Sequence, residues 1–70
     1  MNMHRVRRGQ SYRIISTPED MLLRALGLRK GTEFGLVTKQ PFKGPLVIKI
    51  GNRNVAVCRS IAEQIMVEEV

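Results

Sequence analysis

The chain has 70 residues, a formal net charge of +6, 43% hydrophobic residues and 26% charged residues. This length allows one small domain, residues 1–70, with little room for a deep catalytic cleft, and the composition is globular rather than disordered. No stretch approaches the roughly 18 apolar residues of a membrane span, and no signal-peptide core follows Met1. Since Cys58 is the only cysteine, no internal disulfide can form, and we expect a cytoplasmic protein.

Residues 1–26 are predicted to form a lead-in, a strand and a short helix. Residues 1–8 read as an irregular lead-in, in which Val6 docks on the edge of the sheet. The β-branched and aromatic residues of segment 11–16 predict the first strand. Thr17 is a suitable helix cap and a proline follows it, so we expect a helix over residues 18–26.

A glycine-bounded corner follows this helix. Gly27 suits the left-handed position just beyond a helix C-terminus, and Leu28 would then fold back onto Leu23 in the last turn. Gly31 turns the chain into the next strand. This segment therefore joins the helix to the remaining strands.

The second half predicts four more short strands. Phe34, Leu36 and Thr38 alternate on one face of the second strand, and prolines and a glycine mark a loop at residues 41–45. Gly51 and its neighbours predict a hairpin turn. The remaining elements are strands at 46–50, 55–58 and 65–67, with one helical turn at 60–64 capped by Ser60.

Five short strands joined by tight turns bury their apolar faces best by curling into a barrel. We therefore predict a mostly β fold of the all-β class, a five-stranded SH3-like barrel. Its helix, between the first two strands, plugs one end. The expected inward residues are Tyr12, Ile14, Leu23, Leu26, Leu28, Phe34, Leu36, Leu46, Ile48, Ile50, Val55, Val57, Ala62, Ile65 and Val67.

The order of these features resembles one known family. The helix-ending Leu26-Gly27-Leu28, then Gly31-Thr32-Glu33 and then Gly44-Pro45-Leu46 follow one another at spacings similar to those of the FeoA family of ferrous iron transport. The resemblance covers roughly residues 9–68. It departs at Lys30, where the family often has proline, and at Leu22 and Cys58, where it often has arginine.

The resemblance implies a small cytoplasmic accessory protein rather than an enzyme. Its expected partner is the membrane ferrous-iron transporter protein B, contacted through that protein's cytoplasmic GTPase domain. The same domain also occurs in iron-dependent repressors, but a chain that begins at Met1 without DNA-binding helices ahead of it favours the free-standing accessory. No cofactor is required, weak or indirect Fe(II) association is compatible with the role, and exposed edge strands allow a homo-oligomer.

The expected contact surface is the outer face of the helix together with the corner. If Leu23 and Leu26 face the core, Leu22 and Ala25 point outward. The alternative is that Leu22 is tucked against the loop at 41–45. The predicted partner-binding residues are Met21, Leu22, Ala25, Arg29 and Lys30.

Metal binding and catalysis have weak support. His4 is the only histidine and Cys58 the only thiol, so the sequence lacks the several His and carboxylate ligands that an Fe²⁺ site needs. We expect Cys58 to be a small hydrophobe, buried or half-buried. No serine has a histidine partner at a recognisable spacing, and Gly27 and Gly31 follow a helix rather than precede one, so no phosphate loop is present.

Nucleic-acid binding is the competing class, because small basic β-barrels can present strands and loops to RNA. Such a face would combine cations of several strands with an aromatic residue, and only Phe42 is expected to be exposed. The candidate cations are Arg13, Lys39, Lys43, Lys49 and Arg53.

Overall fold

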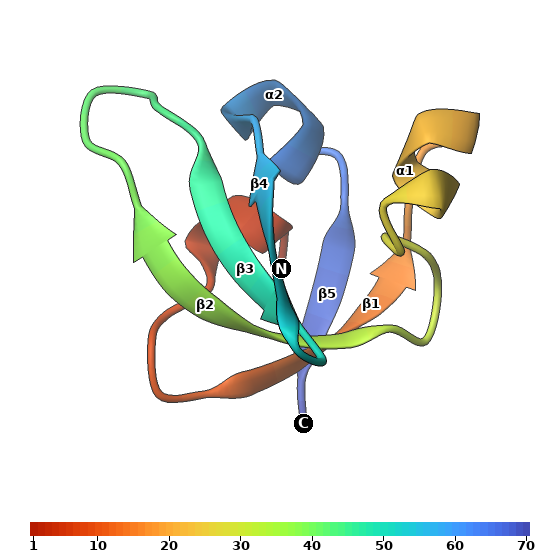
Figure 1. Ribbon diagram of the computed structural model, residues 1–70, viewed down its shortest axis with the longest axis horizontal. Helices are drawn as coiled ribbons and strands as arrows, with labels where there is room; N and C mark the ends of the chain where they lie inside the picture. The colour runs from red at the N-terminus through yellow and green to blue at the C-terminus, as the bar shows by residue number, and fades with distance from the viewer.

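The computed structural model describes residues 1–70 (Figure 1). It confirms five antiparallel strands, with one helix after the first strand and a helical turn before the last. None of the helices has the length and apolar character needed to cross a bilayer. The elements are η1 (Met3–Arg5), β1 (Ser11–Ser16), α1 (Met21–Ala25), β2 (Glu33–Lys39), β3 (Leu46–Ile50), β4 (Arg53–Val57), α2 (Arg59–Ala62) and β5 (Met66–Glu69).

All five strands belong to one curled sheet of order β4-β3-β2-β1-β5. The register shifts between Leu36 and Thr38 in β2 and between Ile14 and Ser16 in β1. Such irregularities bend strands and increase their twist, so the sheet folds around one core (Figure 1). The predicted SH3-like β fold is confirmed.

The core contains 14 buried residues, all of them hydrophobic. Of the residues predicted to face inward, Leu26, Leu36 and Ile50 are only partly buried, and the other twelve belong to this core. Met3 and Val6 complete it: Val6 was expected to dock on the edge of the sheet, whereas burial of Met3 was not predicted. The core residues are Met3, Val6, Tyr12, Ile14, Leu23, Leu28, Phe34, Leu46, Ile48, Val55, Val57, Ala62, Ile65 and Val67.

The prediction of an irregular lead-in is therefore wrong for residues 1–6. The Met3 N–H donates to the Ile65 carbonyl at 2.8 Å, and the Val67 N–H donates to the Met1 carbonyl at 2.8 Å. These bonds pair the first residues with the outer side of β5, whose inner side pairs with β1. Backbone N–H and C=O groups at a sheet edge can be buried only if they are hydrogen-bonded. Because the N-terminal residues pair with this edge of β5, the side chains of Met3 and Val6 can enter the core.

Both helices begin at other residues than predicted. The Asp20 side chain accepts a hydrogen bond from the Leu22 N–H at 2.8 Å, so Asp20 rather than Thr17 caps α1. Thr17 and the proline after it precede the helix, which leaves only five helical residues. In α2 the cap position is Cys58, and Ser60 lies inside the helix. Leu23 is the one buried residue of α1, so the helix does not fill the barrel end with an apolar stripe.

The predicted corner after α1 is confirmed. Gly27 has φ +87°, in the left-handed region that favours glycine. Its N–H donates to the Arg24 carbonyl at 3.0 Å, and the Leu28 N–H donates to the Leu23 carbonyl at 2.8 Å. These two bonds are those of a Schellman motif, and Leu28 and Leu23 both join the core as this motif requires.

Two side chains from outside the helix also bind this corner. The Arg53 guanidinium donates to the Leu26 carbonyl at 2.9 Å, and the Thr32 hydroxyl donates to the Gly27 carbonyl at 2.8 Å. A Cβ on Gly27 would overlap the Arg53 guanidinium, whereas a Cβ on Gly31, at φ +92°, would meet nothing. The end of α1 is thus fixed to the start of β4.

We expect Gly27→Ala to lower the free energy of unfolding by about 2 kcal/mol, and Gly31→Ala by about 1 kcal/mol. Both alanines would have positive φ, but only the first would also displace Arg53 from the Leu26 carbonyl. Urea unfolding of the two variants measures the difference. Equal losses would contradict a stabilising role for the Arg53 contact.

We expect Met3→Ala to lower the free energy of unfolding by about 3 kcal/mol, because a fully buried side chain would leave a cavity. Met21→Ala, at a residue that is 87% exposed, is the matched control and should change it by less than about 0.5 kcal/mol. Chemical denaturation of both variants tests whether the N-terminal segment belongs to the core. Similar, small effects would show that it does not.

Candidate functional site

The five residues predicted to bind a partner lie together on α1 and in the turn after it. We call them the α1–corner surface. All five are exposed: Met21 is 87% exposed and Leu22 is 65% exposed. Leu22 is therefore not tucked beneath the loop at 41–45. The surface consists of Met21, Leu22, Ala25, Arg29 and Lys30.

A shallow hollow of about 500 Å³ borders this surface. Met21, Arg29 and Lys30 line it, whereas Leu22 and Ala25 lie outside it. The hollow brings three cations and two carboxylates to the start of the helix. Its lining is Thr17, Pro18, Glu19, Asp20, Met21, Arg24, Arg29 and Lys30.

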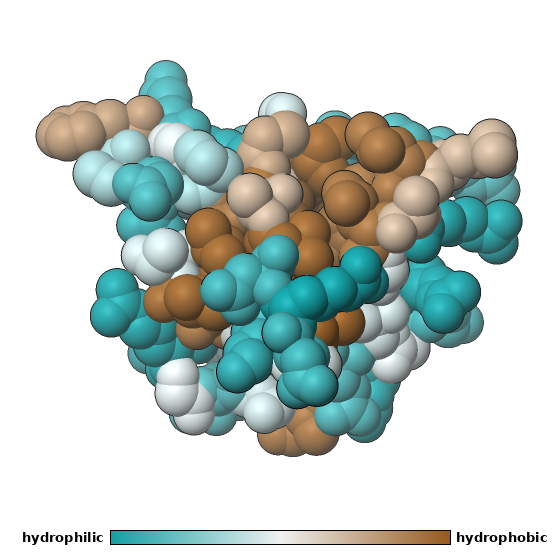
Figure 2. Space-filling view, viewed as in Figure 1, coloured by the Kyte–Doolittle hydropathy of each residue, from teal (hydrophilic) through white to brown (hydrophobic).

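A second exposed apolar group is Phe42 at the tip of the β2–β3 loop. Phe42 and Lys43 have φ of 58° and 68°, an uncommon conformation for residues other than glycine, and the Phe42 side chain is 98% exposed. The loop and α1 lie at the same end of the molecule as α2 (Figure 1), and hydrophobic residues are exposed over that end (Figure 2). The two prolines and the glycine of segment 41–45 predicted this loop, and the exposure of Phe42 was also predicted.

Cys58 is exposed, so the prediction of a buried or half-buried hydrophobe is wrong. It precedes α2 in extended backbone conformation, and its Sγ lies 3.5 Å from the Ser60 hydroxyl oxygen. Hydrogen bonds from the Ser60 hydroxyl, and next from the Ile61 backbone N–H, lower the pKa of the Cys58 thiol. The thiol is thus more readily ionised than an ordinary cysteine.

The potential metal ligands do not gather. No group of three or more His, Cys, Asp or Glu side chains lies close enough together to hold a metal ion. Two of the glutamates near the C-terminal end bind cations instead: Glu63 lies 3.5 Å from Arg59, and Glu68 lies 3.1 Å from Arg13.

Two of the cations proposed for a nucleic-acid face are bound within the protein. Arg13 lies between Glu33, at 3.6 Å, and Glu68, at 3.1 Å. Arg53 donates to the Leu26 carbonyl. A phosphate backbone would have to compete with these contacts for both guanidinium groups, although exposed contacts of this kind are individually weak.

Comparison with protein-family models matches the FeoA domain over residues 1–69. A search of curated proteins finds no match. The fold is similar to the crystal structure of an iron uptake regulatory protein (FeoA), with a TM-score of 0.87 and 19% identity, over 100% of this chain and 97% of that one. It is also similar to iron(II) transport protein A from Clostridium thermocellum, with a TM-score of 0.80 and 31% identity. This chain is covered completely in that second comparison but spans only 46% of the Clostridium chain.

We expect the rate of Cys58 alkylation by iodoacetamide to rise with pH around a midpoint below that of a free cysteine. Ser60→Ala should move the midpoint upward, because the largest hydrogen bond to the thiolate is lost. Mass spectrometry of the alkylated chain between pH 6 and 10 measures both midpoints. An unchanged midpoint in the variant would contradict the assigned cause.

Proposed function

The chain belongs to the FeoA family, and from this membership we propose that it is a small accessory protein of ferrous iron transport. It acts in the cytoplasm by contact with the membrane Fe(II) transporter protein B, at that protein's GTPase domain. The transporter carries the iron and any GTP chemistry. This chain contributes a binding surface and needs no cofactor of its own.

The exposure of Met21 and Leu22 is the observation that best supports a contact role. In α1 only Leu23 is buried, so adjacent large apolar side chains of a single helical turn face solvent. Isolated exposed apolar residues are common, but contiguous ones surrounded by charges are typical of protein-binding sites. Covering these two side chains would provide the apolar centre of an interface.

The charges around this centre favour a partner of matching chemistry. Arg29 and Lys30 follow the helix, Arg24 lies within it, and none of the three forms an ion pair inside the protein. A partner segment with one or two apolar side chains and flanking carboxylates would complement this arrangement. We expect such a segment on the transporter's GTPase domain.

The α1–corner surface is also held in place before binding. The Schellman motif at Gly27 and the Arg53 bond to the Leu26 carbonyl fix the end of α1 to the sheet. A surface that is already ordered loses less conformational entropy on association. This favours the corner over a mobile loop as the contact.

We expect the double substitution Leu22→Asp with Ala25→Glu to weaken binding to detergent-solubilised transporter at least about tenfold. Both side chains are exposed, so the fold should persist. Biolayer interferometry with the immobilised chain gives the dissociation constant. Circular dichroism and thermal unfolding check that the variant is folded.

A matched control carries the same kind of change elsewhere. Val70→Asp with Lys49→Gln alters an exposed apolar residue and a charge outside the α1–corner surface, and should leave affinity within about twofold. Equal affinity of the folded double variant and the parent chain would exclude this surface. Absence of binding by the parent chain itself would contradict the proposed function.

A further inference from the structure

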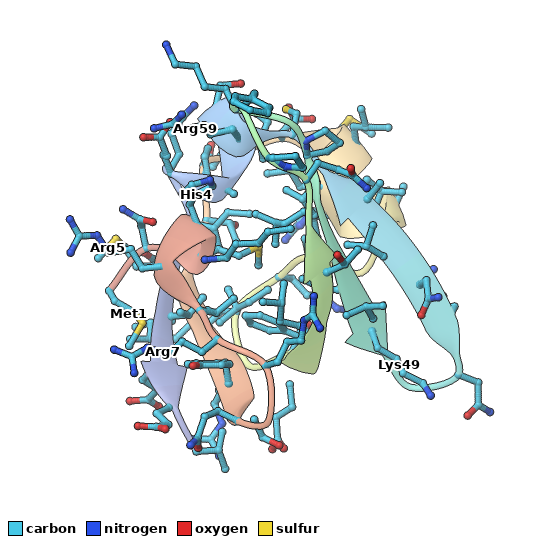
Figure 3. The ribbon with its side chains drawn as sticks, turned by 90° about the vertical axis from the view of Figure 1, so that its left-hand side faces the viewer. Met1, His4, Arg5, Arg7, Lys49 and Arg59 are labelled. Atoms are coloured by element: carbon cyan, nitrogen blue, oxygen red, sulfur yellow. The ribbon has the colours of Figure 1, made fainter.

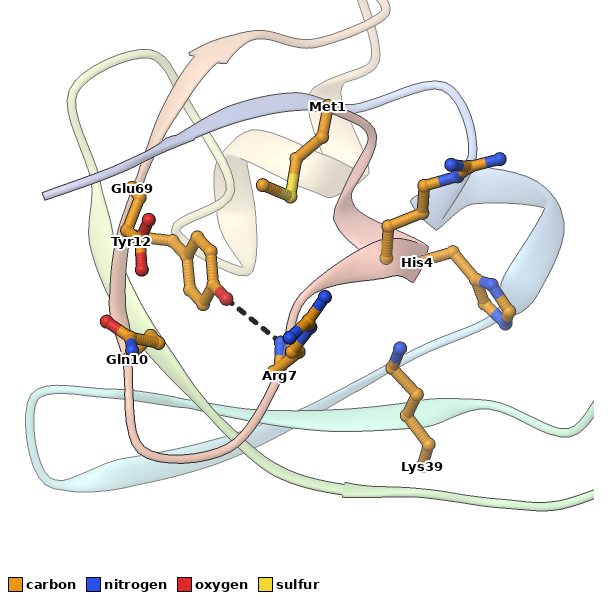
Figure 4. Close-up of a pocket in the computed structure, with 8 residues that line it drawn as sticks. Met1, His4, Arg7, Gln10, Tyr12, Lys39 and Glu69 are labelled. Atoms are coloured by element: carbon orange, nitrogen blue, oxygen red, sulfur yellow. Dashed lines mark hydrogen bonds between the residues drawn. The ribbon is translucent and has the colours of Figure 1, made fainter.

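The largest concave feature lies far from α1 in sequence, between η1 and the end of β2. It is a hollow of about 720 Å³, which is within the usual range of small-molecule sites. It shares no residue with the α1–corner surface or the hollow beside it. Its lining, drawn in Figure 4, is Met1, His4, Arg5, Arg7, Gln10, Tyr12, Lys39 and Glu69.

The hollow carries an excess of positive charge that the protein does not neutralise. Arg5, Arg7 and Lys39 face one carboxylate, that of Glu69, and none of the four forms an ion pair. Figure 3 shows His4, Arg5 and Arg7 on one flank of the molecule, with Lys49 on the opposite side. Three cationic side chains and one carboxylate line this hollow, so it presents a net positive charge to solvent.

Arg7 and Lys39 approach each other from different elements. Arg7 lies in the segment before β1 and Lys39 ends β2, and both side chains point into the hollow (Figure 4). Burial, and second the charge of Arg7, lower the pKa of Lys39. An anion bound in the hollow would offset the repulsion between these two cations, neither of which forms an ion pair within the protein.

Tyr12 supplies a rigid floor and an additional donor. Its side chain is 2% exposed and stacks on Phe34, with 5.8 Å between ring centroids. The hydroxyl oxygen accepts the Arg7 backbone N–H at 3.0 Å, which fixes the Arg7 segment over the ring. The hydroxyl hydrogen has no acceptor in the protein, so it is free to bind an anion at the base of the hollow.

From this arrangement we propose that the hollow binds the phosphate or diphosphate group of a small molecule, held between Arg7 and Lys39. Arginine forks and lysine ammonium groups are the side chains that suit phosphate oxygens best. Because Tyr12 is buried, its ring cannot stack on a nucleic-acid base, and the only other ring in the lining is the imidazole of His4. A phosphate group is therefore favoured over single-stranded RNA.

The test is a titration of the isotopically labelled 70-residue chain with sodium pyrophosphate, and separately with inorganic phosphate. Amide chemical shifts are recorded while sodium chloride is adjusted to keep ionic strength constant. We expect saturable shifts confined to the hollow, with pyrophosphate binding more tightly because it can reach both cations. The responding amides should be those of residues 4–12, Lys39 and Glu69.

Neutralising a cation and neutralising the carboxylate of the hollow should change the affinity for pyrophosphate in opposite directions. Arg7→Gln and Lys39→Gln should each weaken pyrophosphate binding about fivefold to tenfold, since each removes one charge-assisted contact. Glu69→Gln should strengthen it, because the only carboxylate of the hollow is neutralised. Lys49→Gln removes a charge on the opposite flank and is the matched control, with no expected change (Figure 3). The Arg7 backbone N–H, which binds Tyr12, remains in the Arg7 variant.

Three results would overturn the proposal. Equal shifts with chloride alone would mean simple screening, and equal weakening by Lys49→Gln would mean a diffuse charge effect. RNA binding that depends on Arg7 and Lys39 without any response to pyrophosphate would assign the hollow to a nucleic acid.

A further experiment uses vesicles of phosphatidylglycerol and phosphatidylcholine. Co-sedimentation that pyrophosphate displaces would support the phosphate site and name a lipid headgroup as its source.

Discussion

The curvature of one short-stranded sheet determines the rest of this structure. Strands of four to seven residues enclose a core of 14 side chains, and no helix covers the sheet as a second layer. The register shifts in β1 and β2 supply the bend that lets opposite ends of the sheet share that core. A bent sheet still has two edges, and the N-terminal residues pair with the outer side of β5 and add Met3 and Val6 to the interior. The N-terminal segment is thus part of the barrel.

In layered folds a helix packs its apolar face against a sheet, whereas α1 contributes little to the core. α1 buries Leu23 alone and is held at its end by the Gly27 corner and Arg53. A five-residue helix has no appreciable stability by itself, so these contacts maintain its shape. Its remaining side chains can face solvent without loss of the fold. This explains how the same short element exposes Met21 and Leu22 and still presents them in a fixed geometry.

Local patterns predicted the strands and the corner, whereas contacts between distant segments did not follow from them. Alternation identified the buried face of β3, and the positive φ required at Gly27 was visible from its place after an apolar helix. Met3 and Val6 stand in an arginine-rich run, and their partner is β5 at the other end of the chain, so periodicity gave no signal. Thr17 and Asp20 are both good caps, and only the path of the chain after β1 selects Asp20. The outward placement of Leu22 and Ala25 followed from helical spacing. That Arg7 and Lys39 line the same hollow could be seen only in the folded structure.

The distribution of acids explains why two surfaces of different chemistry remain open. The chain has 12 lysines and arginines but only six acids. Glu33 and Glu68 bind Arg13, Glu63 binds Arg59, and Asp20 caps α1, so four acids already have partners. Glu19 remains beside the α1–corner surface and Glu69 beside the N-terminal hollow, each among several cations. At the first surface the charges surround exposed apolar side chains, which favours a protein partner. In the hollow the cations Arg7 and Lys39 line the same concave surface as the hydroxyl of a buried tyrosine, which favours a small anion instead.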